Sequence, residues 1–266
     1  MIHIVASDLD GTLLTPQHQV ADFTKEVLTS LHEKGIRFIF ATGRHHVDVH
    51  HIRDTVGIPA FMITSNGARV HDENNNLVFS RNIEPDSVKP LIDLVKDDTN
   101  LFVHIYRNDE WLLNREDKKL DHFHKDSGFS YTLFDDEQPP TDGIAKIFVT
   151  HADHDYLVKY ETLFNETLGD SVTVAFSTPW CLEVMAANVS KGEALKAVAE
   201  SFGHSLENCI AFGDGMNDVE MLSMAGKGLV MATSHEKVKK ALPSNEVIGS
   251  HEHEAVAHYL NELFLK

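Results

Sequence analysis

Cysteine, basic side chains and long apolar runs are all scarce in this chain of 266 residues. Two cysteines, Cys181 and Cys209, are too few for a disulfide framework or a thiolate metal site. No stretch approaches the roughly 18 apolar residues of a membrane span, and no basic segment leads into an apolar run at the N-terminus. We therefore expect a cytoplasmic protein with no membrane partner.

The charge balance narrows the range of partners further. Lys and Arg number 23 against 41 Asp and Glu, which gives a net charge of −18. Such a chain repels nucleic acid at long range, so nucleic acid is not an expected partner. An anionic substrate would need cations placed locally. With 42% hydrophobic residues, the chain can bury one large core, or one core plus a smaller domain.

Short apolar runs alternate with helical patterns in the first and last parts of the chain. This alternation is typical of an α/β fold with a Rossmann-like parallel sheet covered by helices. Helical spacing follows several of the runs, and Ser190 with Glu193 predicts a capping box at a helix start. The predicted core strands are residues 2–6, 37–41, 60–64, 209–212 and 229–231.

The middle of the chain has a different pattern, with many strands and few helices. Helical patterns cover only residues 86–96 and 155–168. Predicted strands there are residues 100–107, 111–114, 144–150, 172–177 and 182–186. We interpret this part as an inserted α+β domain, residues 83–188. The core would then be discontinuous and consist of residues 1–82 and 189–266.

Polar clusters follow the predicted core strands or precede a core helix. In a parallel sheet such clusters gather at the carboxyl edge, where ligands bind. They are Asp8, Asp10 and Thr12; ATGR at 41–44; SNG at 65–67; SKGE with Lys191; and GDGMND at 213–218.

Asp8 and Asp10 share one face of an extended backbone, where their carboxylates repel each other unless a cation lies between them. Oxygen ligands of this kind suit Mg²⁺, which also joins substrate phosphate to carboxylates. Asp8 is then a candidate nucleophile, and Asp10 a candidate for proton transfer.

The ordered motifs DLDGT, ATGR, SNGA, SKGEAL and GDGMND resemble those of the haloacid dehalogenase superfamily, and within it the Cof-type phosphatases. The longer stretches ATGRHHVDV, CLEVMA and CIAFGDGMND are similar to those of bacterial pyridoxal phosphate phosphatases. The resemblance implies a Mg²⁺-dependent phosphatase acting on small phosphomonoesters, such as pyridoxal phosphate or sugar phosphates. The insert would be a cap that chooses the leaving group.

The resemblance also implies residue roles. Asp8 would attack phosphorus, and Asp10 would protonate the leaving oxygen and later activate water. Phosphate would contact Thr42, Gly43, Arg44, Asn66, Lys191 and Asn217. Mg²⁺ would be held by Asp8, Asp10 through its backbone carbonyl, Asp214 and Asp218.

Alternatives to these interpretations remain open. A phosphomutase would use the same aspartates but return the phosphoryl group to a bound sugar. A non-enzymatic regulator that responds to phosphorylation, resembling a receiver domain, would also join carboxylates, threonine and lysine. Arg44 could form a structural ion pair instead of binding phosphate. Among His45, His46, His50 and His51, the pair His46 and His50 has the helical spacing of zinc ligands.

Overall fold

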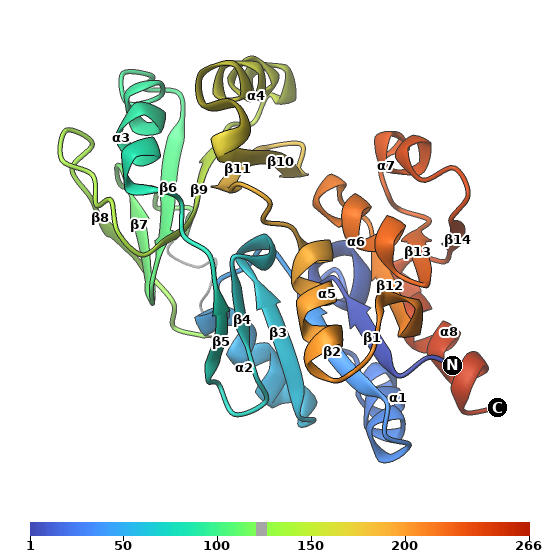
Figure 1. Ribbon diagram of the computed structural model, residues 1–266. Coiled ribbons are helices and arrows are strands. Elements are labelled where there is room, and N and C mark those ends of the chain that lie inside the picture. Colours follow the sequence, from blue (N-terminus) through green and yellow to red (C-terminus); the bar gives the residue numbers. More distant parts are fainter. Residues whose placement is uncertain (121–126) are drawn as a thin grey trace.

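The computed structural model describes residues 1–120 and 127–266. Eight strands form one sheet, here the core sheet, in the order β14-β13-β12-β1-β2-β3-β4-β5 (Figure 1). They are β1 (Ile4–Ser7), β2 (Arg37–Ala41), β3 (Ala60–Thr64), β4 (Arg69–His71), β5 (Leu77–Ser80), β12 (Cys209–Gly213), β13 (Lys227–Met231) and β14 (Glu246–Ile248).

The core sheet is parallel from β14 to β3 and turns antiparallel at β4 and β5. This arrangement confirms the predicted α/β class with a parallel-rich sheet. Two of the five predicted core strands, β2 and β3, have the predicted bounds. The short strands β4, β5 and β14 were not predicted, because three or four residues of mixed polarity give no periodic signal.

Side chains of the core strands alternate between two helical layers. Val5, Phe40 and Phe212 belong to the core packed under α1 (Asp22–Glu33), α2 (His46–Val56) and α8 (Ala255–Phe264). Ile4, Ile39 and Ala211 face α5 (Lys191–Ser201), α6 (Val219–Met224) and α7 (Glu236–Ala241) on the opposite side. This period of two is what a sheet buried on both faces requires.

A second sheet, here the insert sheet, is formed by the chain between β5 and β12 (Figure 1). Its order is β10-β11-β9-β6-β7-β8, and all its pairs are antiparallel except β7 with β8. The strands are β6 (Phe102–Arg107), β7 (Glu110–Leu113), β8 (Tyr131–Leu133), β9 (Ile144–Thr150), β10 (Val172–Thr178) and β11 (Cys181–Ala186).

Helices α3 (Pro85–Asp93) and α4 (His154–Leu168) cover the outer face of the insert sheet, and its other face is turned toward the core sheet (Figure 1). Ala68 of the core packs in one apolar cluster with Tyr106, Phe148 and Met185 of the insert. The two sheets therefore enclose the carboxyl edge of the core strands between them. Within the described residues, no helix combines the length and apolar character needed to cross a bilayer.

Candidate active site

Four charged side chains meet at the carboxyl edge of the core sheet. Asp8 follows β1, Asp214 follows β12, Asp218 lies in the turn beyond it, and Lys191 opens α5. Lys191 Nζ lies 2.7 Å from Asp8 Oδ1 and 2.6 Å from Asp218 Oδ1. One carboxylate oxygen from each of the three aspartates lies within 4.8 Å of the other two. Motifs far apart in the sequence therefore form one site, here the acidic site.

Local hydrogen bonds and a glycine fix the carboxylates of the acidic site. Asp218 Oδ2 accepts from the backbone N–H groups of Asp214 at 3.0 Å and Gly215 at 2.8 Å. Thr12 Oγ1 donates to Asp214 Oδ1 at 2.9 Å. Gly11 has a φ of 78°, and a Cβ there would lie 2.5 Å from Asp214 Oδ2. Because any other residue would be strained and would collide with this carboxylate, the DGT turn requires glycine.

Burial and crowding control the ionisation of the acidic site. Burial raises the pKa of Asp8 well above its usual range, and the nearby Asp218 and Asp214 raise it further against the effect of Lys191. Burial and the charge of Asp218 raise the pKa of Asp214 to about 7. Burial opposes the charge of Lys191, but the carboxylates of Asp218 and Asp8 outweigh it, so the pKa of Lys191 is raised. Three carboxylates thus share one ammonium group, which leaves a need for further positive charge.

Asp10 lies two residues beyond Asp8, but its carboxylate meets a different set of groups. Arg44 donates to both Asp10 oxygens at 2.6 Å, and its third contact is with Asp48 Oδ2 at 2.6 Å. His18 Nδ1 lies 2.9 Å from Asp10 Oδ1. Burial alone would raise the pKa of Asp10, but the hydrogen bonds from Arg44 and His18 lower it far below its usual range. Arg44 is therefore engaged in ion pairs here, and it keeps Asp10 ionised.

Asn66 connects the core edge to the insert sheet. Its backbone has a φ of 57°, and its side chain is buried. Its Nδ2 donates to the Glu183 carboxylate, and its Oδ1 accepts from Asn217 Nδ2 at 3.0 Å. A Cβ on Gly43 would lie 3.0 Å from the same Asn66 Oδ1, so the ATGR loop packs closely against this contact. Glu183 also accepts from Lys146 Nζ, which makes a polar path from the core into the insert.

The insert surface around Lys146 and Glu183 is aromatic. Lys146 Nζ lies 4.9 Å from the ring centroid of Tyr106 and 4.5 Å from that of Phe148. Both members of the Lys146–Glu183 ion pair have side chains only 3% exposed. Trp111 packs in the same cluster. A ligand held here would meet flat apolar walls and one buried ion pair.

The structure thus distributes the predicted site residues over three contact sets. Asp8, Lys191, Asp214 and Asp218 form the acidic site, Asp10 pairs with Arg44, and Gly43, Asn66 and Asn217 lie together beside Glu183. Thr42 is buried between them, where its Oγ1 accepts from the Arg44 backbone N–H at 3.1 Å.

Four residues of these sets were not predicted as site residues: His18, Asp48, Lys146 and Glu183. Lys146 and Glu183 did leave a signal, because each is a single charge inside an otherwise apolar strand, IAKIFVT and CLEVMA.

The histidines after ATGR do not converge on one metal. His46 Nε2 lies 2.9 Å from Asp109 Oδ1, whereas His50 Nε2 lies 3.2 Å from Asp54 Oδ2. His45 Nε2 lies 2.9 Å from the backbone oxygen of Asn108. In the described ranges, the one group of metal-ligating side chains with converging ligand atoms is Asp8, Asp214 and Asp218. Within the described residues, the zinc interpretation of His46 and His50 is therefore not supported.

The acidic site fits Mg²⁺ by its donor chemistry. Its ligand atoms are carboxylate oxygens, which are the donors that Mg²⁺ prefers, and it contains no sulfur or imidazole donor. The raised pKa values of Asp8 and Asp214 show that the three carboxylates are under-neutralised without a cation. Asp8, Asp214 and Asp218 are the residues that would hold the ion.

Comparisons with known proteins agree with this geometry. Residues 5–260 match the family model of the haloacid dehalogenase-like hydrolases. A protein of Haemophilus influenzae is 45% identical over 98% of this chain and 96% of its own length. A protein of Cronobacter sakazakii named HMP-PP phosphatase is 38% identical, covering 98% of this chain and 95% of the relative.

Solved structures share the whole architecture. A haloacid dehalogenase-like hydrolase from B. subtilis superposes with a TM-score of 0.88 at 23% identity, covering 99% of this chain and all of the other. A sugar phosphatase of subclass IIB of the superfamily gives a TM-score of 0.84 at 20% identity over 99% of both chains. At these identities the likeness shows the fold, which includes both sheets.

Proposed function

The chain belongs to the haloacid dehalogenase-like hydrolases and is a phosphatase, and from this premise we propose that it hydrolyses small phosphomonoesters with Mg²⁺ through an aspartyl-phosphate on Asp8. The observation that carries the proposal is the acidic site, where a buried carboxylate next to Lys191 faces two further carboxylates. Proposed substrates are pyridoxal phosphate and sugar phosphates. The name of the Cronobacter relative adds HMP-PP to the esters that should be tested.

The proposed first step is attack on phosphorus by Asp8. Lys191 binds Asp8 Oδ1, so the other carboxylate oxygen is the one that forms the new bond to phosphorus. The ester P–O bond breaks, and the leaving oxygen takes a proton from Asp10. Bound by Asp8, Asp214 and Asp218, Mg²⁺ would supply positive charge for the transferring phosphoryl oxygens, and Lys191 would add its own positive charge. Thr42 and the backbone of Gly43 complete the proposed phosphate contacts.

The second step is hydrolysis of the aspartyl-phosphate. Asp10 accepts a proton from water, the water oxygen bonds to phosphorus, and Asp8 is released with free phosphate. The Arg44 ion pair holds Asp10 in the ionised form that this step needs. In the first step Asp10 must instead carry a proton, so its carboxylate has to leave Arg44 when substrate binds.

We also propose that residues 83–188 act as a cap over the residues of the core. Asn66 donates to Glu183 across the two sheets, and Lys146 lies beside it. In this proposal Glu183 and Lys146 bind the polar groups of the leaving alcohol. The aromatic side chains around them would hold its apolar parts. Phosphoryl transfer would then depend on the core residues, and substrate choice on the insert.

A panel of phosphomonoesters tests the proposal directly. Phosphate release is measured from pyridoxal phosphate, several sugar phosphates, HMP-PP and p-nitrophenyl phosphate, with Mg²⁺ and with chelator, in parallel with the Asp8→Asn variant. We expect release that requires both Mg²⁺ and Asp8. Release that persists in Asp8→Asn would contradict the covalent mechanism. Phosphoryl transfer to a second sugar position, dependent on a bisphosphate activator, would indicate a mutase, and no turnover of any ester would indicate a regulator.

A further inference from the structure

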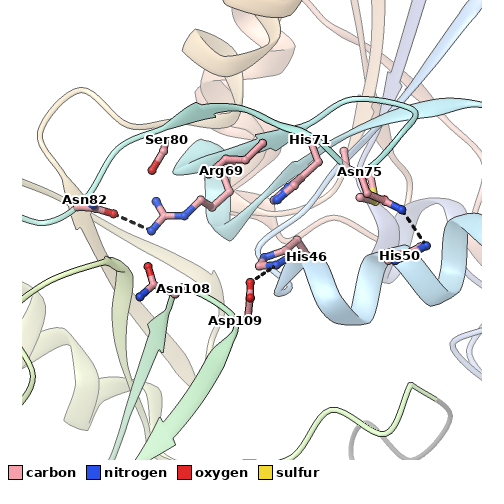
Figure 2. A pocket seen from close by; sticks show the side chains of 11 residues that line it. His46, His50, Arg69, His71, Asn75, Ser80, Asn82, Asn108 and Asp109 are labelled. Carbon is pink, nitrogen blue, oxygen red and sulfur yellow. Dashed lines mark hydrogen bonds and ion pairs between the residues drawn. The ribbon is translucent and has the colours of Figure 1, made fainter.

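A cavity of about 350 Å³ lies between α2, the β4–β5 hairpin and the turn that joins β6 to β7 (Figure 2). Its walls come from the core residues His46 and His71, from Asn82 on the chain that leaves β5, and from Asp109 of the insert. None of the acidic-site residues lines it. The volume is in the range of small-molecule sites. We call this cavity the hinge pocket, because it touches both sheets and the segment that connects them.

Arg69 contributes a buried positive charge to the hinge pocket. Its side chain donates to three backbone carbonyls, those of Ala68, Arg81 and Gly143, at 2.9 Å, and to Asn82 Oδ1 at 2.6 Å (Figure 2). All four acceptors are neutral, and over residues 1–120 and 127–266 no carboxylate lies within ion-pair distance of the guanidinium. The four bonds use the N–H groups of the two terminal nitrogens, which leaves the Nε–H as a donor. A buried cation with no carboxylate in direct contact is unfavourable, so an anion bound to it would be stabilised.

Two histidines line the pocket with unused nitrogen atoms. His46 and His71 stack with ring centroids 4.4 Å apart. His71 is 94% buried, its relative exposure being 6%, and in the part of the chain that the structure describes the Nδ1 atoms of both rings are buried without a hydrogen-bond partner. Buried polar atoms are nearly always paired in folded proteins. Two such atoms on adjacent rings therefore mark a place for a polar ligand group.

The charges around these rings favour an anion. His71 faces His46, Arg69, Arg53 and Asp109, and His46 faces the same Arg69 and Asp109 together with His50. The one carboxylate among them, Asp109, is 84% exposed at the rim, where it contacts His46 Nε2. The pocket is thus a local exception in a chain whose net charge is −18.

We propose that the hinge pocket is a second ligand site, which binds a small organic anion through a carboxylate or phosphate group held by Arg69 Nε and by the Nδ1–H group of His71. The rest of the cavity accommodates the body of the ligand, since the volume exceeds that of one oxyanion. A ligand in this place contacts the core, the connecting segment and the insert at once. This site is independent of the proposed phosphatase chemistry.

Histidine-ring nuclear magnetic resonance on the full-length protein tests the proposal. The ¹⁵N signals of the His71 and His46 rings are assigned from the variants His71→Leu and His46→Leu and then followed during titration with succinate and with inorganic phosphate. We expect a saturable shift of both ring signals with at least one probe. Saturation by succinate alone identifies a carboxylate ligand, and saturation by phosphate alone a phosphate ligand. No saturable shift with either probe would overturn the proposal.

A matched pair of variants checks that the shift comes from anion binding in the pocket. Leu77 lines the cavity on β5 and is 52% exposed, so replacing it should not disturb folding. Leu77→Glu should weaken binding of the probe roughly threefold, the effect of two like charges about 6 Å apart in water, and Leu77→Gln should leave it unchanged. Equal affinities in the two variants would overturn the proposal. Both variants should release phosphate from ester substrates at the rate of the unmodified protein. Anion binding in the hinge pocket and phosphatase activity are therefore tested by separate measurements.

Discussion

Buried charge is arranged in opposite ways on the two surfaces that face each other across the site. On the core sheet, three carboxylates share the single ammonium group of Lys191. On the insert sheet, the one carboxylate of Glu183 is matched by the one ammonium group of Lys146. A further cation would balance the first set, as the proposed metal-assisted phosphoryl transfer expects. The balanced pair needs no metal, which suits recognition of an uncharged part of the substrate.

The largest expected effect is on the core side of this comparison. Asp8→Asn removes the proposed nucleophile, so turnover of every ester should fall by more than the roughly 10⁴-fold upper range of losing a general acid or base. Steady-state phosphate release measures it, with circular dichroism as the folding control. If the loss depended strongly on the leaving group, Asp8 would not be the common nucleophile.

Asp10→Asn should be milder and should depend on the ester. Loss of general catalysis costs typically 10²- to 10⁴-fold per step. The nitrophenolate of p-nitrophenyl phosphate leaves without much protonation, so the variant should form the intermediate faster than it hydrolyses it. Rapid mixing should show a nitrophenolate burst near one equivalent per site, and none with an alkyl ester. Identical behaviour of Asp10→Asn and Asp8→Asn on both esters would remove the division of roles between them.

The Lys146–Glu183 ion pair of the insert sheet allows its charge balance to be tested directly. Lys146→Met leaves Glu183 buried without its cation and should lower the free energy of unfolding by about 3–5 kcal/mol. The double variant Lys146→Met with Glu183→Gln, which keeps an oxygen acceptor for Asn66, should recover most of that loss in urea denaturation. It should also keep most activity on p-nitrophenyl phosphate while losing discrimination among larger esters. A double variant as unstable as the single one would show that the two charges do not compensate each other.

Mg²⁺ should stabilise the protein through the acidic site alone. A ligand that binds only the folded state contributes about 2.7 kcal/mol at a hundredfold excess over its dissociation constant. Because the pKa of Asp214 is raised to about 7, this carboxyl holds a proton at pH 5 that Mg²⁺ must displace, so the gain should be larger at pH 8 than at pH 5. Thermal melts of metal-free protein with and without Mg²⁺ measure it. The Lys146→Met and Glu183→Gln double variant is the control and should keep the gain.

The smallest expected effect concerns Arg44, the ion-pair partner of Asp10. Arg44→Gln removes the cation that lowers the pKa of Asp10, so that pKa should rise. Because Asp10 must carry a proton in the first step, the basic limb of the kcat/KM profile should then move to higher pH, with little change in the acidic limb. A basic limb that stays in place would show that Asp10 does not control it.

The sequence predicts the core side far better than the insert side, for a physical reason. Strands buried on both faces, such as β2 and β3, are continuous apolar runs, and polar residues at their carboxyl ends must meet at one edge whatever the details of packing. The contact between Lys146 and Glu183 does not follow from the strand pattern in this way. It exists because Lys146 pairs with Met185 across β9 and β11, which puts Glu183 two residues away on the same face. That register is set by the folded sheet and cannot be read from either strand alone.

The conformation of single loops lies equally beyond sequence patterns. Asp8 and Asp10 were expected to share one face of an extended strand, but β1 ends at Ser7 and the chain turns at Gly11. The two carboxylates therefore contact different cations, Lys191 and Arg44. The motif order was sufficient to predict the family, the fold class and the acidic site, whereas the partners of Asp10 required the structure.

The position of β1 in the core sheet has a consequence for synthesis on the ribosome. β1 pairs with β2 on one side and with β12 on the other, and β12 begins only at Cys209. At translation rates of about 5–20 residues per second, the roughly 200 intervening residues leave one edge of β1 unpaired for on the order of 10–40 s. The insert sheet closes entirely within that interval, since all of its strands precede β12. The nascent chain can therefore complete the insert sheet before the core sheet. It carries an open, aggregation-prone edge on β1 until β12 has emerged.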